Sequence, residues 1–237
     1  MAEAMLKQPG MDVEDMPVLS HIITEDEKPV DNVFSEKQQR LLVEPLYSSW
    51  GSGKPFFAAA NVGVFYAVHQ PPLVPDMFLS LDVQPDEDIW RKENRSYFLW
   101  KFGKPPEVVV EVVSNTEGGE LDRKLRLYAR MGVWYYIVFD PQQFVQDSPL
   151  RVYGLSIARY FPQQDLELTE VGLKLTLWDS KFEGLQAHWL RWCDAEGNLL
   201  LTGREQAEQE HQQVKQERQR AERLLGQLRA LGVEPEI

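Results

Sequence analysis

Short apolar runs separated by turn residues dominate the pattern of hydrophobic and polar positions in much of this chain. The runs are rich in β-branched and aromatic residues and are bounded by Pro, Gly and Asp, which predicts a strand from each. They cover residues 56–60, 62–68, 77–81, 108–113 and 133–139. A further β-rich region, for which antiparallel hairpins are expected, covers 151–155, 157–161, 166–171 and 173–178.

A helix is predicted at the start of the folded region, from Asn32 to about Trp50. Apolar residues recur there at helical spacing, and Asp31 or Asn32 is positioned to cap the first turn. Residues 1–30 are rich in Pro and acidic residues without periodicity, so we expect a flexible acidic N-terminal arm.

A second helix is predicted over residues 119–131. This segment is charged and helical in composition, and Gly132 provides a C-terminal stop. It lies between the predicted strands 108–113 and 133–139, so the three elements form a βαβ-like unit. We therefore expect an α/β fold in which helices flank a mixed sheet.

The chain changes character at residues 203–231, where Pro is absent and Gln, Glu and Arg dominate. Heptad-like spacing relates Ala207, Val214, Ala221, Leu224, Leu228 and Leu231. Three interpretations fit this pattern: a solvated terminal helix, a self-associating coiled coil through which the chain forms a homo-oligomer, and a fraying tail.

We divide the chain into the arm 1–30, a domain 31–202 and a C-terminal helix 203–237.

Composition limits the class of protein. With 43% hydrophobic residues among 237, the chain can form a core and is not disordered as a whole. No segment approaches the roughly 18 apolar residues of a membrane helix, and the N-terminus has no apolar signal-peptide core. Cys193 is the single cysteine, which excludes an internal disulfide framework and a multi-cysteine zinc site. We expect a cytoplasmic protein with no membrane partner.

Three charged residues occupy unusual positions. Glu111 interrupts the near-continuous apolar strand 108–113, where an ionised carboxylate needs a cation, a hydrogen-bond network or proximity to the strand end. A salt-bridged or half-exposed glutamate is the plainer alternative. Asp76 immediately precedes the strand 77–81 and follows Pro75, so it could equally serve only to form a turn. Lys124 lies on or beside the apolar stripe of the helix 119–131, so its ammonium is expected to point toward the sheet; a snorkelling lysine at the edge of this stripe is the plainer alternative.

Two acids and a lysine at one edge of a sheet suggest metal-assisted hydrolysis of a phosphodiester. The acids would hold Mg²⁺, because carboxylate oxygens suit this ion. The lysine would orient a water molecule or stabilise the charged transition state.

Several segments resemble the PD-(D/E)XK nuclease superfamily, and more narrowly its Uma-two family of bacterial restriction-endonuclease-like proteins. They are Pro75-Asp76, PPEVVVEVVS (105–114) and DRKLRLYARMGVWYYIVFDP (122–141), and the resemblance covers roughly 30–200. It implies a restriction-endonuclease-like fold with a C-terminal helical extension, and Mg²⁺-dependent cleavage of nucleic acid, DNA in the first instance, with Mn²⁺ as a possible substitute.

The resemblance also implies roles for individual residues. Asp76 and Glu111 match the metal-binding acids, and the backbone carbonyl of Val112 matches the third protein ligand. The superfamily lysine is expected at position 113, which is Val113 here. In this family the lysine has moved to the following helix, where Lys124 matches. An additional acid from the first helix is often present, and Glu36 is only a loose match.

The net charge of −12 opposes simple binding to nucleic acid. Residues 203–237 hold six Lys or Arg and seven Asp or Glu, so the remainder still carries −11. Two hypotheses therefore stay open. One is a Mg²⁺-dependent endonuclease that meets DNA through a local basic patch. The other is a catalytically inactive nuclease-like module that acts as a binding or regulatory subunit assembled through the C-terminal helix.

The loop 82–104 mixes aromatic and basic residues. It fits either contact with nucleic acid or packing of its aromatic residues over the edge of the sheet.

Overall fold

The computed structural model describes residues 32–114 and 120–230. The chain divides into two compact units, Met1–Leu200 and Leu201–Ile237. The expected arm 1–30 and Leu231 of the expected heptad stripe lie outside the described residues.

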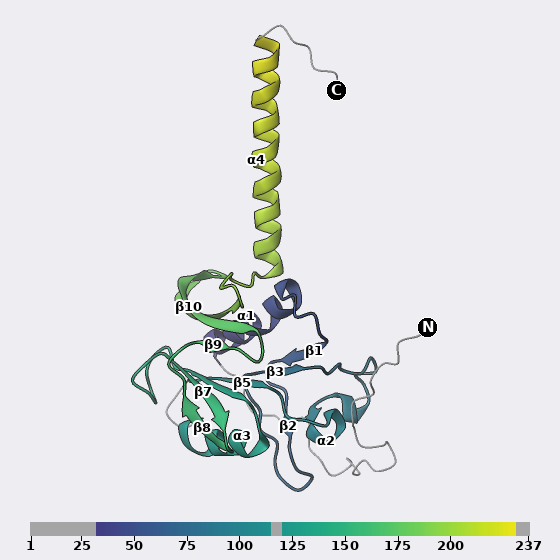
Figure 1. Ribbon diagram of the computed structural model, residues 1–237, viewed down its shortest axis with the longest axis vertical. Helices are drawn as coiled ribbons and strands as arrows, with labels where there is room; N and C mark the ends of the chain where they lie inside the picture. The colour runs from purple at the N-terminus through teal and green to yellow at the C-terminus, as the bar shows by residue number, and fades with distance from the viewer. Residues whose placement is uncertain (1–31, 115–119, 231–237) are drawn as a thin grey trace. The chain divides into compact units, whose positions relative to one another are not determined.

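A six-stranded mixed sheet forms the centre of the first unit (Figure 1). Its order is β1-β3-β5-β6-β7-β8, and β5 and β6 are its parallel pair, whereas the other neighbours are antiparallel. The strands are β1 (Phe56–Ala59), β3 (Met77–Leu81), β5 (Val108–Val112), β6 (Tyr135–Phe139), β7 (Leu150–Ser156) and β8 (Arg159–Pro162). This arrangement confirms the predicted α/β fold with a mixed sheet.

Alternation along the central strands divides the core into two layers. On β5, Val108, Val110 and Val112 face the layer that contains Leu42 and Leu46 of helix α1 (Val33–Ser49). Asn32 caps this helix by accepting a hydrogen bond from the Ser35 N–H at 3.0 Å. The same layer receives a three-stranded antiparallel sheet of β9 (Glu167–Leu168), β10 (Leu173–Phe182) and β11 (Leu185–Asp194).

The opposite layer contains Val109 and Val113 of the β5 region and Tyr128 of helix α3 (Leu125–Met131). Glu111 shares the parity of these two valines, so period-two alternation places it on this face. The helix predicted over 119–131 is present from Glu120 to Met131, and residue 119 lies outside the described residues. Its first described turn, Glu120–Lys124, is π-helical. It ends at Gly132, whose φ of 90° is left-handed, as expected for the C-terminal stop.

The loop 82–104 contains short elements. These are the 3₁₀ turn Lys92–Asn94, β4 (Tyr97–Phe98), which pairs in parallel with β2 (Val64–Phe65), and α2 (Leu99–Phe102). Tyr97, Phe98 and Phe102 are buried, whereas the Trp90 side chain is 78% exposed. Most of these aromatic residues therefore contribute to packing.

Strand lengths differ from expectation in the last third of the first unit. The predicted strand 166–171 is only Glu167–Leu168, and 173–178 extends to Phe182. The hairpin that follows was missed: Glu183 and Gly184 form a two-residue turn with φ of 44° and 89°, typical of tight hairpins, and lead into β11.

The second unit contains helix α4 (Gly203–Ala230), which confirms the helical prediction for this segment. Thr202 and Glu205 form a reciprocal capping box at its start. The Thr202 N–H donates to Glu205 at 2.8 Å, and the Glu205 N–H donates to Thr202 at 3.2 Å. Among the described residues, no helix is both long and apolar enough to cross a bilayer.

Candidate active site

Asp76 lies where the β3–β5 ladder ends. Met77 pairs with Val110, so the next donor on this side of β5 is the N–H of Val112, beyond the last paired residue of β3. Oδ2 of Asp76 accepts a hydrogen bond from this N–H at 2.7 Å. A carboxylate oxygen thus takes the place of the missing strand carbonyl and holds Asp76 beside the end of β5.

Glu111 is buried at the same end of β5, with 1% of its surface exposed. Lys124 Nζ donates to its Oε2 at 2.8 Å, and the Tyr128 hydroxyl donates to its Oε1 at 3.0 Å. Both donors come from the helical segment after β5 and are four residues apart, so they lie on one helix face. The structure therefore provides the cation and the hydrogen-bond network that a buried carboxylate requires.

Burial and, to a smaller extent, the negative charge of Asp76 raise the pKa of Glu111 to about 8, even though the nearby Lys124 ammonium lowers it. Burial also holds the pKa of Tyr128 well above its usual range, so Tyr128 stays a neutral donor. The pair of acids therefore contains one carboxyl group that can change its charge near neutral pH, and a cation beside both acids would favour the ionised form.

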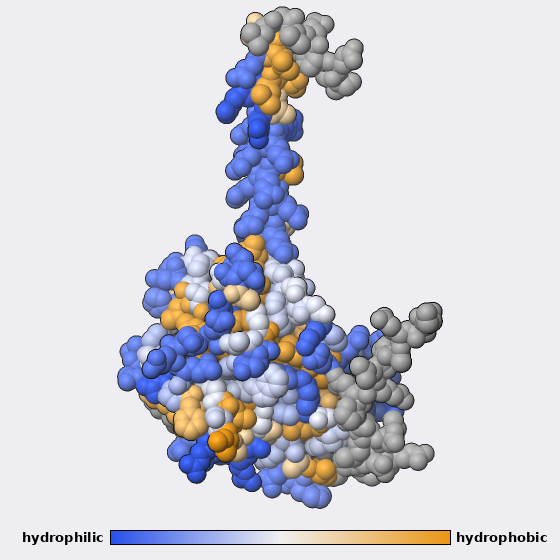
Figure 2. All heavy atoms as spheres, in the orientation of Figure 1, coloured by the Kyte–Doolittle hydropathy of each residue, from blue (hydrophilic) through white to orange (hydrophobic). Residues whose placement is uncertain are grey.

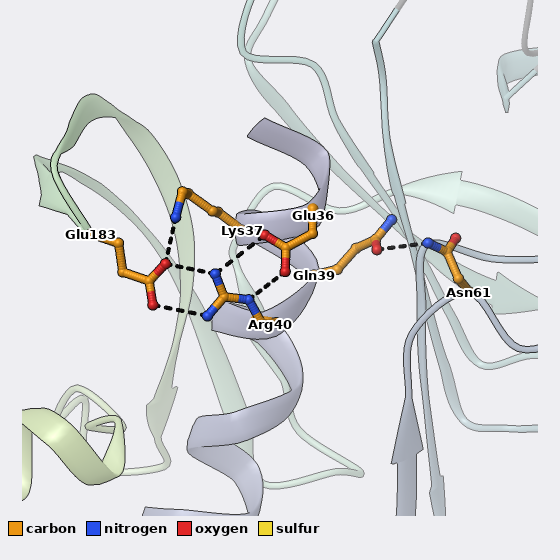
Figure 3. Close-up of polar contacts among 6 residues, drawn as sticks. All are labelled: Glu36, Lys37, Gln39, Arg40, Asn61 and Glu183. Atoms are coloured by element: carbon orange, nitrogen blue, oxygen red, sulfur yellow. Dashed lines mark hydrogen bonds and ion pairs between the residues drawn. The ribbon is translucent and has the colours of Figure 1, made fainter. Parts of the chain in front are cut away.

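Helix α1 also contacts Asp76. Gln39 Nε2 donates to Asp76 Oδ1 at 2.7 Å. Figure 3 shows another contact of this amide, in which Asn61 Nδ2 donates to Gln39 Oε1 at 2.8 Å. Glu36, the loose match for an acid of the first helix, instead pairs with Arg40 on the exposed side of α1. The first-helix residue that contacts the site is a glutamine.

Sequence reasoning missed three residues of this arrangement: Gln39, Asn61 and Tyr128. A signal existed for Gln39, which lies three residues before Leu42 and seven before Leu46 and so interrupts the apolar face of α1. Tyr128 fits the apolar stripe of the helix predicted over 119–131, and the sequence does not show where its hydroxyl lies.

Val113 occupies the position where the superfamily pattern has lysine. Its side chain is buried in the core layer of Val109 and Tyr128. Lys124 approaches Glu111 from that same layer, with 25% of its side chain exposed. The sequence expectation that Lys124 points toward the sheet is confirmed.

Asp140 lies in the segment 122–141 that resembles the nuclease family, and its role is structural. It is fully buried, and its carboxylate accepts hydrogen bonds from the backbone N–H groups of Phe144, Val145 and Gln146 at 2.8 to 3.1 Å. It therefore organises the turn after β6.

The possible oxygen ligands are few. Among the described residues, no group of three or more His, Cys, Asp or Glu side chains converges as a metal site. The expected set contains only two carboxylates and one backbone carbonyl. Mg²⁺ is compatible with so few protein ligands, because it retains several water molecules in its coordination shell.

Comparison with known proteins gives a family assignment. A crystal structure titled a "putative nuclease belonging to DUF820" from Anabaena variabilis is similar, with 16% sequence identity and a TM-score of 0.40. The match covers 59% of this chain and 72% of that one. No curated protein matches. The Uma2 family model, described as "Putative restriction endonuclease", matches residues 23–177. Because this match spans more than half of the chain, the protein belongs to the Uma2 family.

Proposed function

We propose that this protein is a Mg²⁺-dependent endonuclease that hydrolyses DNA phosphodiester bonds, with Mn²⁺ as a possible substitute. The observation that carries the proposal is the convergence of Asp76, Glu111 and Lys124 at the end of β5. Asp76 contacts the backbone of Val112 at 2.7 Å, and Lys124 contacts Glu111 at 2.8 Å. The family assignment supports a nuclease.

Asp76, Glu111 and the carbonyl of Val112 would hold the metal. The N–H and C=O of a strand residue point to the same side of the strand. The Val112 carbonyl therefore faces the side on which its N–H meets Asp76. A bound Mg²⁺ would supply Lewis acidity and lower the pKa of its bound water.

Lys124 would assist through its ammonium group. This group donates a hydrogen bond to Glu111, and a quarter of the lysine side chain remains exposed. Its three donor hydrogens allow it to keep one contact with Glu111 while it donates to a water molecule or a phosphoryl oxygen. Tyr128 would keep the Glu111 carboxylate oriented from the buried side.

Helix α3 and the π-helical turn before it also offer a route for DNA contact. Arg123, Arg126 and Arg130 are exposed on the segment that carries Lys124. Arg126 pairs with Asp122 at 2.7 Å, an exposed contact that a phosphate could replace. Binding through such a small patch on an acidic protein should be modest and should weaken strongly with salt.

The direct test incubates the full chain with supercoiled plasmid, linear duplex, single-stranded DNA and RNA, with Mg²⁺, Mn²⁺ or EDTA. We expect divalent-metal-dependent cleavage of DNA, lost with EDTA and in Asp76→Asn. Cleavage that is unchanged in Asp76→Asn, or no cleavage of any substrate, would contradict the proposal.

The second candidate function is an inactive nuclease-like subunit, and one observation favours its assembly through α4. Val214, Leu224 and Leu228 are 63%, 50% and 37% exposed on this helix. Figure 2 shows a hydrophilic helix with apolar side chains gathered toward its C-terminal end. The occupant we propose for this face is α4 of a second copy.

Truncation after Thr202 should convert an oligomer into a monomer in analytical ultracentrifugation. A full-length chain that is monomeric would contradict assembly through α4.

A further inference from the structure

We propose that Gln39 is a positioning residue for Asp76 and forms the middle of a hydrogen-bond relay that runs from Asn61 through Gln39 to Asp76. This inference rests on the proposed metal site at Asp76, and it assigns to α1 the role of fixing the orientation of that carboxylate. Gln39 itself would not contact the metal or the substrate.

The relay has one consistent direction of hydrogen donation. An ionised carboxylate only accepts hydrogen bonds, so the amide nitrogen of Gln39 must face Asp76, at 2.7 Å. The amide oxygen then faces away and accepts from Asn61 Nδ2 at 2.8 Å (Figure 3). Gln39 is only 4% exposed, so its amide depends on these partners.

Asn61 supplies the outer end of the relay from the segment between β1 and β2. Its backbone φ of 53° is left-handed, a conformation that asparagine adopts more readily than most residues. Asn61 is an exposed residue, yet its side-chain amide nitrogen is directed to Gln39 (Figure 3). The amide oxygen of Gln39 is thereby paired, which keeps its nitrogen turned to Asp76.

The two oxygens of Asp76 are therefore held from two directions. Oδ1 is held by α1 through Gln39, and Oδ2 is held by the Val112 N–H of β5. Each carboxylate oxygen can accept more than one interaction, so both remain able to bind a cation. Hydrogen bonds to a ligating carboxylate fix its orientation, and their loss commonly weakens metal binding about 10- to 100-fold.

The neighbouring Gln38 provides a matched control. It is also a glutamine of α1, it is fully buried, and it makes two hydrogen bonds. Its amide donates to the Leu190 carbonyl at 2.8 Å and accepts from the Leu190 N–H at 2.9 Å, both on β11. Loss of this side chain also removes buried amide hydrogen bonds from α1, but neither of the two named here involves Asp76.

The experiment compares Gln39→Met, Gln38→Met and Asn61→Ala in the full chain. Mn²⁺ affinity is measured by calorimetry, and hydrogen exchange of the Val112 amide is measured by NMR without metal. Gln39→Met should weaken Mn²⁺ binding about 10- to 100-fold and accelerate exchange of the Val112 amide. Gln38→Met should lower the melting temperature but leave both quantities unchanged. Asn61→Ala should change Mn²⁺ affinity and Val112 amide exchange less than Gln39→Met does. In a double variant that already carries Gln39→Met, Asn61→Ala should have no further effect.

The two readouts separate failure of the relay from failure of the proposed function. If the wild type does not bind Mn²⁺ even with duplex DNA, the proposed metal-dependent function is wrong. Exchange of the Val112 amide in the metal-free protein then still judges the relay. If Gln39→Met leaves this exchange at the wild-type rate, or behaves like Gln38→Met in both readouts, the proposed role of Gln39 is overturned.

Discussion

Lys124 Nζ lies 2.8 Å from Oε2 of Glu111, and this ion pair joins the helix after β5 to the buried end of the strand. Lys124→Met should preserve most of the packing contributed by the lysine stem while it removes the ammonium. We expect cleavage to fall by about 10²- to 10³-fold, the scale on which one contact to developing charge contributes.

The matched control for this substitution is Arg126→Met. Arg126 lies on the same helix, its side chain is exposed, and it pairs with the exposed Asp122. Cleavage of DNA at low salt should fall much less in this variant than in Lys124→Met. Equal losses in both variants would show that Lys124 acts only through general attraction of DNA.

Glu111 should make the stability of the metal-free protein depend on pH. Burial raises its pKa in the folded state from 4.5 to about 8. The folded protein therefore retains a proton that the unfolded chain releases between these values, so the stability contributed by this group declines as pH rises from about 4.5 to 8. Urea unfolding across this interval should show a steeper decline for the wild type than for Glu111→Gln. Identical pH dependence would contradict this assignment.

Metal binding should release a proton for the same reason. A cation held by Glu111 requires the ionised carboxylate, so affinity for Mn²⁺ should rise with pH and level off above about 8. Calorimetry at pH 7 in two buffers with different ionisation enthalpies measures the released protons directly. A binding enthalpy that does not depend on the buffer would contradict the prediction.

An exposed charge network should contribute little to stability. Arg40 and Lys37 hold the pKa of Glu183 at about 2 through hydrogen bonds across to the hairpin turn (Figure 3). The stabilisation is present above the usual pKa of 4.5 and is lost as pH falls toward about 2. Because solvent screens these groups, Glu183→Gln should cost less than about 1 kcal/mol at neutral pH. A cost that does not decrease at high salt in urea unfolding would argue against a screened surface network.

Glu111 and Lys124 could be predicted from local patterns. Glu111 interrupts an apolar strand, and helical spacing places Lys124 toward the sheet, so each prediction depends only on its own element. Gln39 and Asn61 could not be assigned in this way. Their contact with Asp76 requires α1 to lie beside the segment after β1, which is a property of tertiary packing.

Strand β11 was missed because its sequence does not alternate clearly. Arg191 lies in the middle of its buried part and is fully buried. The guanidinium stacks 4.8 Å from the Trp178 ring and donates to the Leu200 carbonyl at 2.7 Å. A charged residue with such partners can occupy a buried strand, but the partners are not visible in the linear pattern. The predicted strand 62–68 was too long: β2 is only Val64–Phe65, because its partner β4 has only two residues. The length of that partner is also not visible in the linear pattern.

We propose that Asp76 and Glu111 together hold one divalent cation. The most direct measurement is a calorimetric titration of Mg²⁺ and Mn²⁺ into the wild type, Asp76→Asn and Glu111→Gln, with and without a short DNA duplex. We predict binding by the wild type that is lost in both variants. Absence of binding by the wild type in the presence of duplex, or undiminished binding by either variant, would contradict the claim.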